Sequence, residues 1–238
     1  MVGGWRAGRL PVNISAESPG RGVGPGVGHS GPVADSPDLL LLSRWLTPVP
    51  GFLAPLVGAG ARIGYVPTAS SIYPDQTWLD LDRATLEAQG FEVVDVDPEL
   101  VSTATFTRAL GEIDAIFVAG GNVFHLLGAL RQTGADRPLV HAVRHGLPYI
   151  GASAGAAVTG PDIAPLHLLD DPSEAAPLES TAGLGLIDVT IIPHAEGTVG
   201  GRERIDRTLE QYPDHPLQLL RDDEALVFSG GRRRIIPG

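Results

Sequence analysis

The stretch Tyr149–Val158, with the sequence YIGASAGAAV, places the strongest constraint on how this chain folds. An apolar run ends in Gly-Ala-Ser and an alanine-rich helix former follows directly, so Ser153 is expected at a junction between a strand and a helix. Gly151 and Gly155 stand two residues before and after the serine, where larger side chains would collide with the neighbouring strand or helix. The pattern is typical of a nucleophile elbow, which exposes a serine hydroxyl at the carboxyl end of a strand.

A serine hydroxyl is a weak nucleophile at neutral pH, and it therefore needs a histidine base that a carboxylate orients. His194 is the expected base because it follows the apolar strand predicted over residues 189–192, which places it at the same carboxyl edge as Ser153. His167, in the polar loop 161–179, and His215, in a turn, are weaker alternatives. The backbone N–H of Ala154 is expected to face the negative charge that develops during attack.

The carboxylate that orients the histidine has three candidates in the sequence. Asp170 and Asp171 lie in the loop between Ser153 and His194, and Glu196 lies two residues beyond the histidine. Both arrangements can orient an imidazole. Asp170 is the preferred interpretation, with Asp171 and Glu196 as alternatives.

From residue 38 onward, apolar strands alternate with amphipathic helices, which predicts an α/β fold with a mostly parallel sheet and right-handed crossovers. A closing β-hairpin is expected around Ser229-Gly230-Gly231. Asn122 follows the strand 115–119 and can cap the next helix. The expected strands are 39–42, 62–67, 91–96, 115–119, the strand that leads to Ser153, 189–192, 224–228 and 233–236; the expected helices are 78–89, 105–110, 123–131, 137–145 and 202–211.

The composition restricts the partners and the compartment. A formal net charge of −11 opposes binding to nucleic acid or to an anionic membrane, which leaves a small peptide or another small molecule as the expected ligand. The absence of Cys removes disulfides, thiolate metal sites and a cysteine nucleophile. The N-terminus lacks the apolar stretch of a signal peptide, and no part of the sequence has the apolar length of a membrane span, so a cytoplasmic location is the expectation.

Two further segments are interpreted without a specific function. Residues 1–37 are rich in Gly and Pro and lack apolar periodicity, which predicts a disordered extension ahead of one catalytic domain over residues 38–238. His141 and His145 share a helix face, but no Glu stands between them and no third ligand is evident. We expect no metal and no cofactor.

The motifs together resemble one family of serine peptidases. Gly120-Gly121-Asn122, Gly151-Ala152-Ser153-Ala154-Gly155, the loop with Asp170-Asp171-Pro172, and Pro193-His194 occur in the order found in the dipeptidase E, or aspartyl dipeptidase, family, to which cyanophycinase is related. The resemblance extends from about residue 39 to residue 236. It implies a flavodoxin-like, three-layer fold of the class I glutamine amidotransferase type, with serine in place of cysteine.

The resemblance also implies an activity and further site residues. The expected reaction is hydrolysis of small peptides, above all dipeptides with an N-terminal aspartate, through an acyl-enzyme. It implies that the N–H of Gly121 joins that of Ala154 in an oxyanion hole and that Asn122 contacts the substrate. Arg202 or Arg204 are candidates, by their position after His194, for binding the aspartate side chain.

Other functions remain open at this stage. A cyanophycinase-like hydrolase of β-aspartyl peptides is the nearest variant. An esterase of the α/β-hydrolase type shares the elbow, and a non-catalytic binding protein could retain the fold. A homodimer is also an option.

Overall fold

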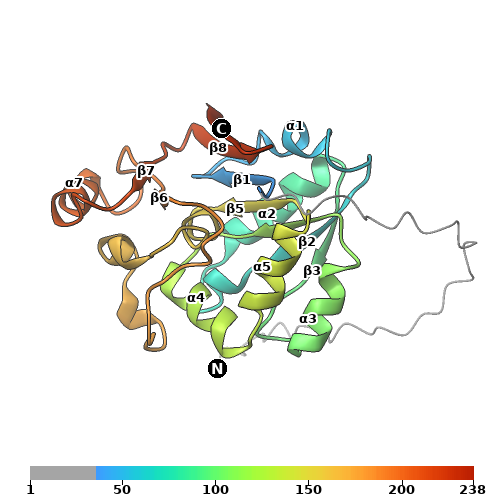
Figure 1. The fold of residues 1–238 in the computed structure, drawn as a ribbon, viewed down its shortest axis with the longest axis horizontal. Helices are drawn as coiled ribbons and strands as arrows, with labels where there is room; N and C mark the ends of the chain where they lie inside the picture. Colours follow the sequence, from blue (N-terminus) through green and yellow to red (C-terminus); the bar gives the residue numbers. More distant parts are fainter. Residues whose placement is uncertain (1–35) are drawn as a thin grey trace, which may run out of the picture. The chain divides into compact units, whose positions relative to one another are not determined.

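The structure, a computed structural model, describes residues 36–238 (Figure 1). The extension expected over residues 1–37 therefore lies outside the described residues, apart from its last two positions. The predicted succession of strands and helices from residue 38 onward is confirmed in type and order for every element that was expected, with boundaries shifted by one or two residues.

A seven-stranded sheet forms the centre of the described chain, in the order β3-β2-β4-β5-β1-β8-β9. The first five strands in this order are parallel, whereas β8 runs antiparallel to β1, and β9 antiparallel to β8. The last two strands are the predicted hairpin. The bounds are β1 Leu39–Leu42, β2 Arg62–Val66, β3 Glu92–Asp95, β4 Ala115–Val118, β5 Tyr149–Ala152, β8 Glu224–Ser229 and β9 Arg232–Pro237.

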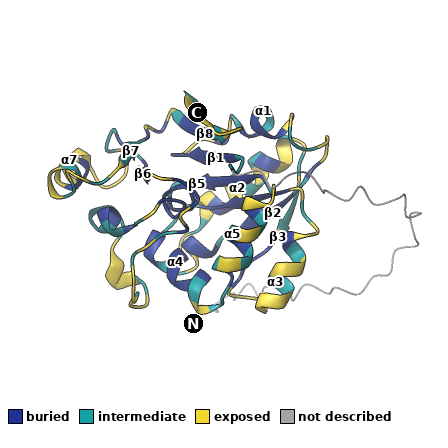
Figure 2. Ribbon diagram, in the orientation of Figure 1, coloured by how far each residue is buried: buried dark blue, intermediate teal, exposed yellow. Residues whose placement is uncertain are grey.

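Helices cover both faces of this sheet, which confirms the three-layer α/β architecture. On one face α3, α4, α5 and α6 contribute buried apolar side chains to a common core, and on the other face α1 and α2 do so. Figure 2 shows buried strands between helices whose outer faces are exposed. The bounds are α1 Val49–Leu53, α2 Thr77–Ala88, α3 Thr103–Leu110, α4 Val123–Gln132, α5 Asp136–Arg144, α6 Ala154–Ala157 and α7 Arg202–Gln211, with short 3-10 helices η1 Thr68–Ser70, η2 Ala164–Leu168 and η3 Pro172–Glu174.

The all-leucine strand β1 shows why both faces need a cover. Successive side chains of a strand point to opposite faces, so Leu39 and Leu41 join the core under α4 and α5, while Leu40 and Leu42 join the core under α1 and α2. All four leucines are fully buried. A continuous apolar run of this kind is what a strand buried on both faces requires.

The strand that leads to His194 differs from its expected position. β6 (Thr190–Ile192) does not join the seven-stranded sheet but pairs in parallel with the short β7 (Leu217–Leu219) in a separate two-stranded sheet. Figure 1 shows β6, β7 and α7 grouped at one end of the molecule's main sheet. The expectation that His194 shares a sheet with Ser153 is therefore wrong, although the two residues still meet.

Within residues 36–238, no helix combines the length and the apolar character that a membrane span requires.

Candidate active site

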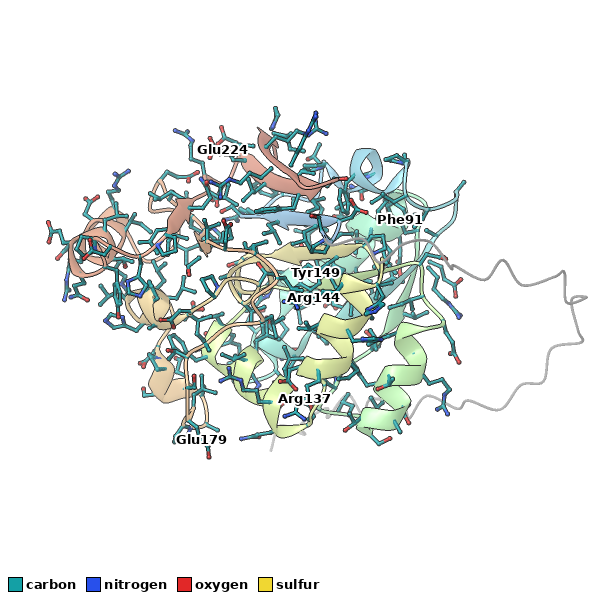
Figure 3. The ribbon with its side chains drawn as sticks, viewed as in Figure 1. Phe91, Arg137, Arg144, Tyr149, Glu179 and Glu224 are labelled. Atoms are coloured by element: carbon teal, nitrogen blue, oxygen red, sulfur yellow. The ribbon has the colours of Figure 1, made fainter. Side chains whose placement is uncertain are left out.

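Ser153 lies at the tight turn between β5 and α6, as the sequence predicts for an elbow. Its backbone has φ of +49°, a conformation that non-glycine residues rarely adopt. A Cβ on Gly155 would lie 2.0 Å from the carbonyl oxygen of Val118, and one on Gly151 would lie 2.3 Å from that of Gly155. The buried Tyr149, labelled in Figure 3, donates its hydroxyl to the Gly155 carbonyl at 2.6 Å. The surrounding packing thus holds the serine in a strained conformation.

His194 contacts Ser153 directly. The serine Oγ lies 3.0 Å from the histidine Nε2. His194 also has a positive φ, of +57°, and these two are the only non-glycine residues with positive φ among those described. Its backbone N–H donates to the Ser43 hydroxyl at 2.7 Å, which fixes the loop after β6 to the end of β1. Such strain at two residues in hydrogen-bond contact is typical of a functional site.

Asp222 holds the other side of the imidazole. Its Oδ1 lies 2.6 Å from the histidine Nδ1. Because an ionised carboxylate only accepts hydrogen bonds, Nδ1 carries the proton and Nε2 is free to accept the proton of Ser153. Asp222 also accepts hydrogen bonds from the hydroxyls of Ser43, at 3.1 Å, and Thr198, at 2.6 Å. Its side chain is only 10% exposed.

The negative charge of Asp222 is stabilised beside the His194 imidazole. Burial by itself would raise the pKa of this carboxyl group. Hydrogen bonds from Thr198, His194 and Ser43, together with the charge that His194 can carry, outweigh burial and leave the pKa of Asp222 below its ordinary value. The group is therefore ionised at neutral pH and can stabilise an imidazolium.

None of the three carboxylates proposed from the sequence contacts the imidazole. Asp170, the preferred candidate, accepts a hydrogen bond from the backbone N–H of Val123 at 2.8 Å. Asp171 caps η3 by accepting from the N–H of Ser173. Glu196 accepts from the backbone N–H of Asp222 at 2.9 Å, so it holds the loop that presents the aspartate. The position expected for Asp170 is occupied by Asp222.

Asp222 reaches the site through the pairing of β8 with β1, which the sequence analysis did not predict. It stands two residues before β8, the first strand of the predicted hairpin, and Ala225 of that strand pairs with Leu42 at the carboxyl end of β1. A strand that runs antiparallel to its neighbours begins at the edge where they end. A search restricted to residues near Ser153 and His194 in sequence misses this position.

Gly121 and Ala154 are the two residues whose backbone N–H groups are expected to form the oxyanion hole. Gly121 and Ala154 both line the cavity that contains Ser153, and neither N–H is hydrogen-bonded within residues 36–238. The Gly121 loop packs so closely on η1 that a Cβ would lie 2.2 Å from the Ala69 carbonyl oxygen. The Ser70 hydroxyl donates to the Gly120 carbonyl at 2.6 Å and fixes the loop further.

The residues that the sequence assigned to substrate contact do not line the cavity around Ser153. Asn122 is fully buried and caps α4, as the sequence also predicted, by accepting from the N–H groups of Phe124 and His125. Arg202 pairs with Asp206 on the exposed side of α7, and Arg204 is exposed and packs against Gly200. Neither arginine lines the cavity around Ser153.

The cavity around Ser153 has a volume of about 670 Å³. The loop Gly120–Gly121, where the oxyanion hole is expected (the oxyanion loop), and the loop after β6 line the cavity beside the serine. Tyr73 and α2 line another part of it, as does the segment after β1. Trp45, Tyr73 and Trp78 contribute aromatic surface. The space suits a small molecule of the size of a short peptide rather than an extended chain.

Two partly buried acidic side chains, Asp170 and Asp82, line this cavity. Burial raises the pKa of Asp170 to about 7, and Glu174 raises it further, while the hydrogen bond from Val123 opposes the shift. Burial likewise raises the pKa of Asp82 to about 7. Both carboxylates therefore gain from a positively charged group that enters the cavity.

The other histidines weighed from the sequence make contacts that do not involve Ser153. His167 contacts the Ala164 carbonyl and the Tyr212 hydroxyl, and His215 lies 3.6 Å from Asp162. His141 and His145 are both exposed at the end of α5, with ring centroids 3.9 Å apart and the rings tilted relative to each other. Among the described residues no three metal-ligating side chains cluster in a way that could hold a metal ion.

Comparison with known proteins assigns this geometry to a family. The model of Peptidase family S51 matches residues 39–236. The chain belongs to this family. Peptidase E of Streptomyces coelicolor is 37% identical over 202 residues, which cover 80% of this chain and 76% of that protein. The resemblance to dipeptidase E noted in the sequence is thereby confirmed.

Other members of the family are similar in sequence or in structure. A protein of Drosophila melanogaster named as a probable alpha-aspartyl dipeptidase is 38% identical over 131 residues, 52% of this chain and 53% of that protein. A crystal structure of a Listeria monocytogenes protein with a provisional peptidase E assignment superimposes with a TM-score of 0.77 and 28% identity, covering 84% of this chain and 98% of that one. The S51 protein is accordingly a serine peptidase, and the esterase and non-catalytic alternatives are set aside.

Proposed function

We propose that this S51 protein hydrolyses dipeptides with an N-terminal aspartate, using Ser153, His194 and Asp222 as a catalytic triad. The observation that carries the proposal is the unbroken series of contacts from the Ser153 hydroxyl to the imidazole and from the imidazole to Asp222, at 3.0 Å and 2.6 Å. Both distances are within the range of a working nucleophile, base and orienting carboxylate.

The proposed reaction follows from these positions. Ser153 Oγ attacks the peptide carbonyl carbon while Nε2 of His194 takes its proton, and the carbonyl oxygen receives hydrogen bonds from the N–H groups of Gly121 and Ala154. His194 then gives the proton to the departing amine, so that the C–N bond breaks and an acyl-enzyme remains. A water molecule, activated by the same imidazole, hydrolyses the ester and restores the serine.

Asp170 supports a requirement for a free N-terminus. Its carboxylate lines the cavity on the side of the oxyanion loop, where it is bonded to the N–H of Val123. A desolvated carboxylate with a raised pKa is stabilised by an ammonium group, and the α-ammonium of a peptide is next to the carbonyl that Ser153 attacks. We assign Asp170 to binding the substrate's ammonium group rather than to orienting His194.

Asp170→Asn should weaken catalysis and stabilise the fold at alkaline pH. The carboxyl group has a higher pKa in the folded than in the unfolded chain, so its contribution to stability is present below the ordinary pKa and is lost as the pH rises through about 7. Asparagine still accepts from Val123 but has no charge to desolvate. We expect a melting temperature about 2–6 °C higher than wild type at pH 8 and no gain near pH 4.

The same variant should lose about 10- to 100-fold in kcat/KM on Asp-Leu at pH 8. Asp171→Asn is the matched control, because this neighbouring carboxyl group is exposed and caps η3 only. Wild type should fail to cleave N-acetyl-Asp-Leu, which has no ammonium group. Equal cleavage of the acetylated and free dipeptides would contradict the assignment of Asp170.

The preference for aspartate is supported by the relatives, since one carries the name alpha-aspartyl dipeptidase. The sharpest comparison uses Asp-Leu and Asn-Leu, which have the same shape and differ in the charge of the first side chain. We expect Asp-Leu to be cleaved more efficiently than Asn-Leu, as the name of this relative implies. If Asn-Leu is cleaved equally well, the aspartyl preference is wrong even where Ser153 is the nucleophile.

A further inference from the structure

Arg44 is a positively charged side chain in the cavity that the triad leaves unused. It follows Ser43 in the segment after β1 and lines the same cavity as Ser153. No other arginine lines this cavity among the described residues. Its guanidinium lies 4.8 Å from the centre of the Trp45 ring, which restrains it by a cation–π contact.

The hydrogen-bond donors of Arg44 are free to bind a ligand. One terminal nitrogen lies 3.8 Å from Oδ2 of Asp222, which is beyond hydrogen-bond distance, and within residues 36–238 the guanidinium donates no hydrogen bond. The side chain is 47% exposed. A guanidinium is a planar fork that matches the two oxygens of a carboxylate.

The position of Arg44 relative to the triad decides which part of a substrate it meets. Arg44 and His194 flank the same carboxylate, that of Asp222. His194 must deliver its proton to the leaving amine, so the leaving residue lies on the histidine side of Ser153. Asp170, by contrast, lies beside the oxyanion loop, where it contacts Val123. A substrate whose carbonyl lies at Ser153 would then meet Asp170 and Arg44 on different sides of the scissile bond.

We propose that Arg44 binds the free C-terminal carboxylate of the leaving amino acid and so restricts the enzyme to dipeptides. This inference rests on the proposed function and adds to it the residue that limits substrate length. In a dipeptide the carboxylate is one carbon from the leaving nitrogen, within reach of a guanidinium beside the triad. A longer peptide, or one with an amidated end, carries no negative charge at that position.

The test compares three substrates that differ in the leaving group alone. Asp-Leu carries the carboxylate, Asp-Leu-amide replaces it by a neutral amide, and Asp-p-nitroanilide lacks it altogether. Arg44→Gln should lower kcat/KM for Asp-Leu by about 10- to 100-fold and leave the two other substrates within about threefold of wild type. Arg44→Lys should recover part of the activity on Asp-Leu, because it restores the charge without the planar fork.

The comparison separates this proposal from its alternatives. Arg108→Gln, on α3, is the matched control for the loss of one arginine, and melting temperatures establish that each variant is folded. If Arg44→Gln lowers activity on all three substrates equally, Arg44 binds the aspartate side chain or tunes Asp222, and the proposal is overturned while the proposed function stands. If wild type cleaves none of the three, the proposed function fails, and the role of Arg44 fails with it.

Discussion

Ser153→Ala is expected to abolish peptide hydrolysis without unfolding the protein. The triad residues act as a unit, and removing the nucleophile costs on the order of 10⁶ in turnover in serine proteases. The hydroxyl makes its hydrogen bond to His194 and to no other described residue, and alanine fits the same strained turn with one atom less. The melting temperature should therefore change by less than about 3 °C. The measurement is release of free aspartate from Asp-Leu.

Two histidine variants serve as controls for this result. His194→Ala should match the loss in Ser153→Ala, because either change removes the proton transfer. His167→Ala should retain wild-type activity, since this histidine contacts Ala164 and Tyr212 instead. A labelled fluorophosphonate should modify wild type and the His167 variant at Ser153. Retention of more than a tenth of wild-type activity in folded Ser153→Ala would falsify the assignment of the nucleophile.

Asp222→Asn should lower kcat on the order of 10³- to 10⁴-fold, a loss of the size seen when a triad aspartate is neutralised in a serine protease. The amide removes the charge that stabilises the imidazolium and allows the wrong tautomer of His194. The variant should also be less stable at neutral pH. The pKa of Asp222 is lower in the folded chain, so its stabilising effect is present above the ordinary pKa and is lost as the pH falls.

Asp222 and Asp170 are distinguished by the reaction of the serine itself. Fluorophosphonate has no ammonium group, so its reaction with Ser153 depends on His194 and the residue that orients it. The labelling rate should fall strongly in Asp222→Asn and stay near wild type in Asp170→Asn. Glu196→Gln should have a smaller effect, because Glu196 holds the backbone of Asp222 rather than the imidazole. The reverse order for the two aspartates would return Asp170 to the triad.

Local sequence patterns determined most of the fold. The fully apolar runs of β1, β4 and β5 predict strands buried on both faces, and the structure buries them so. The tight turn at Ser153 could be predicted because Gly151 and Gly155 flank the serine. The packing of β5 and α6 leaves no room for a larger residue at either position. The cap at Asn122 has a local cause, because its side chain accepts hydrogen bonds from the first turn of α4. The hairpin around Gly230 is local as well, because a short turn connects its two antiparallel strands.

The sequence by itself predicted the strand-to-helix turn at Ser153 and the alternation of strands and helices, because each depends on neighbours within a few residues. Only the tertiary structure decided the third contact of the site. Asp222 is 28 positions from His194, and it reaches the imidazole because β8 is antiparallel to β1. Arg44 likewise enters the cavity because β1 lies beside β5. Long-range strand pairing brings these side chains together, and no local pattern records it.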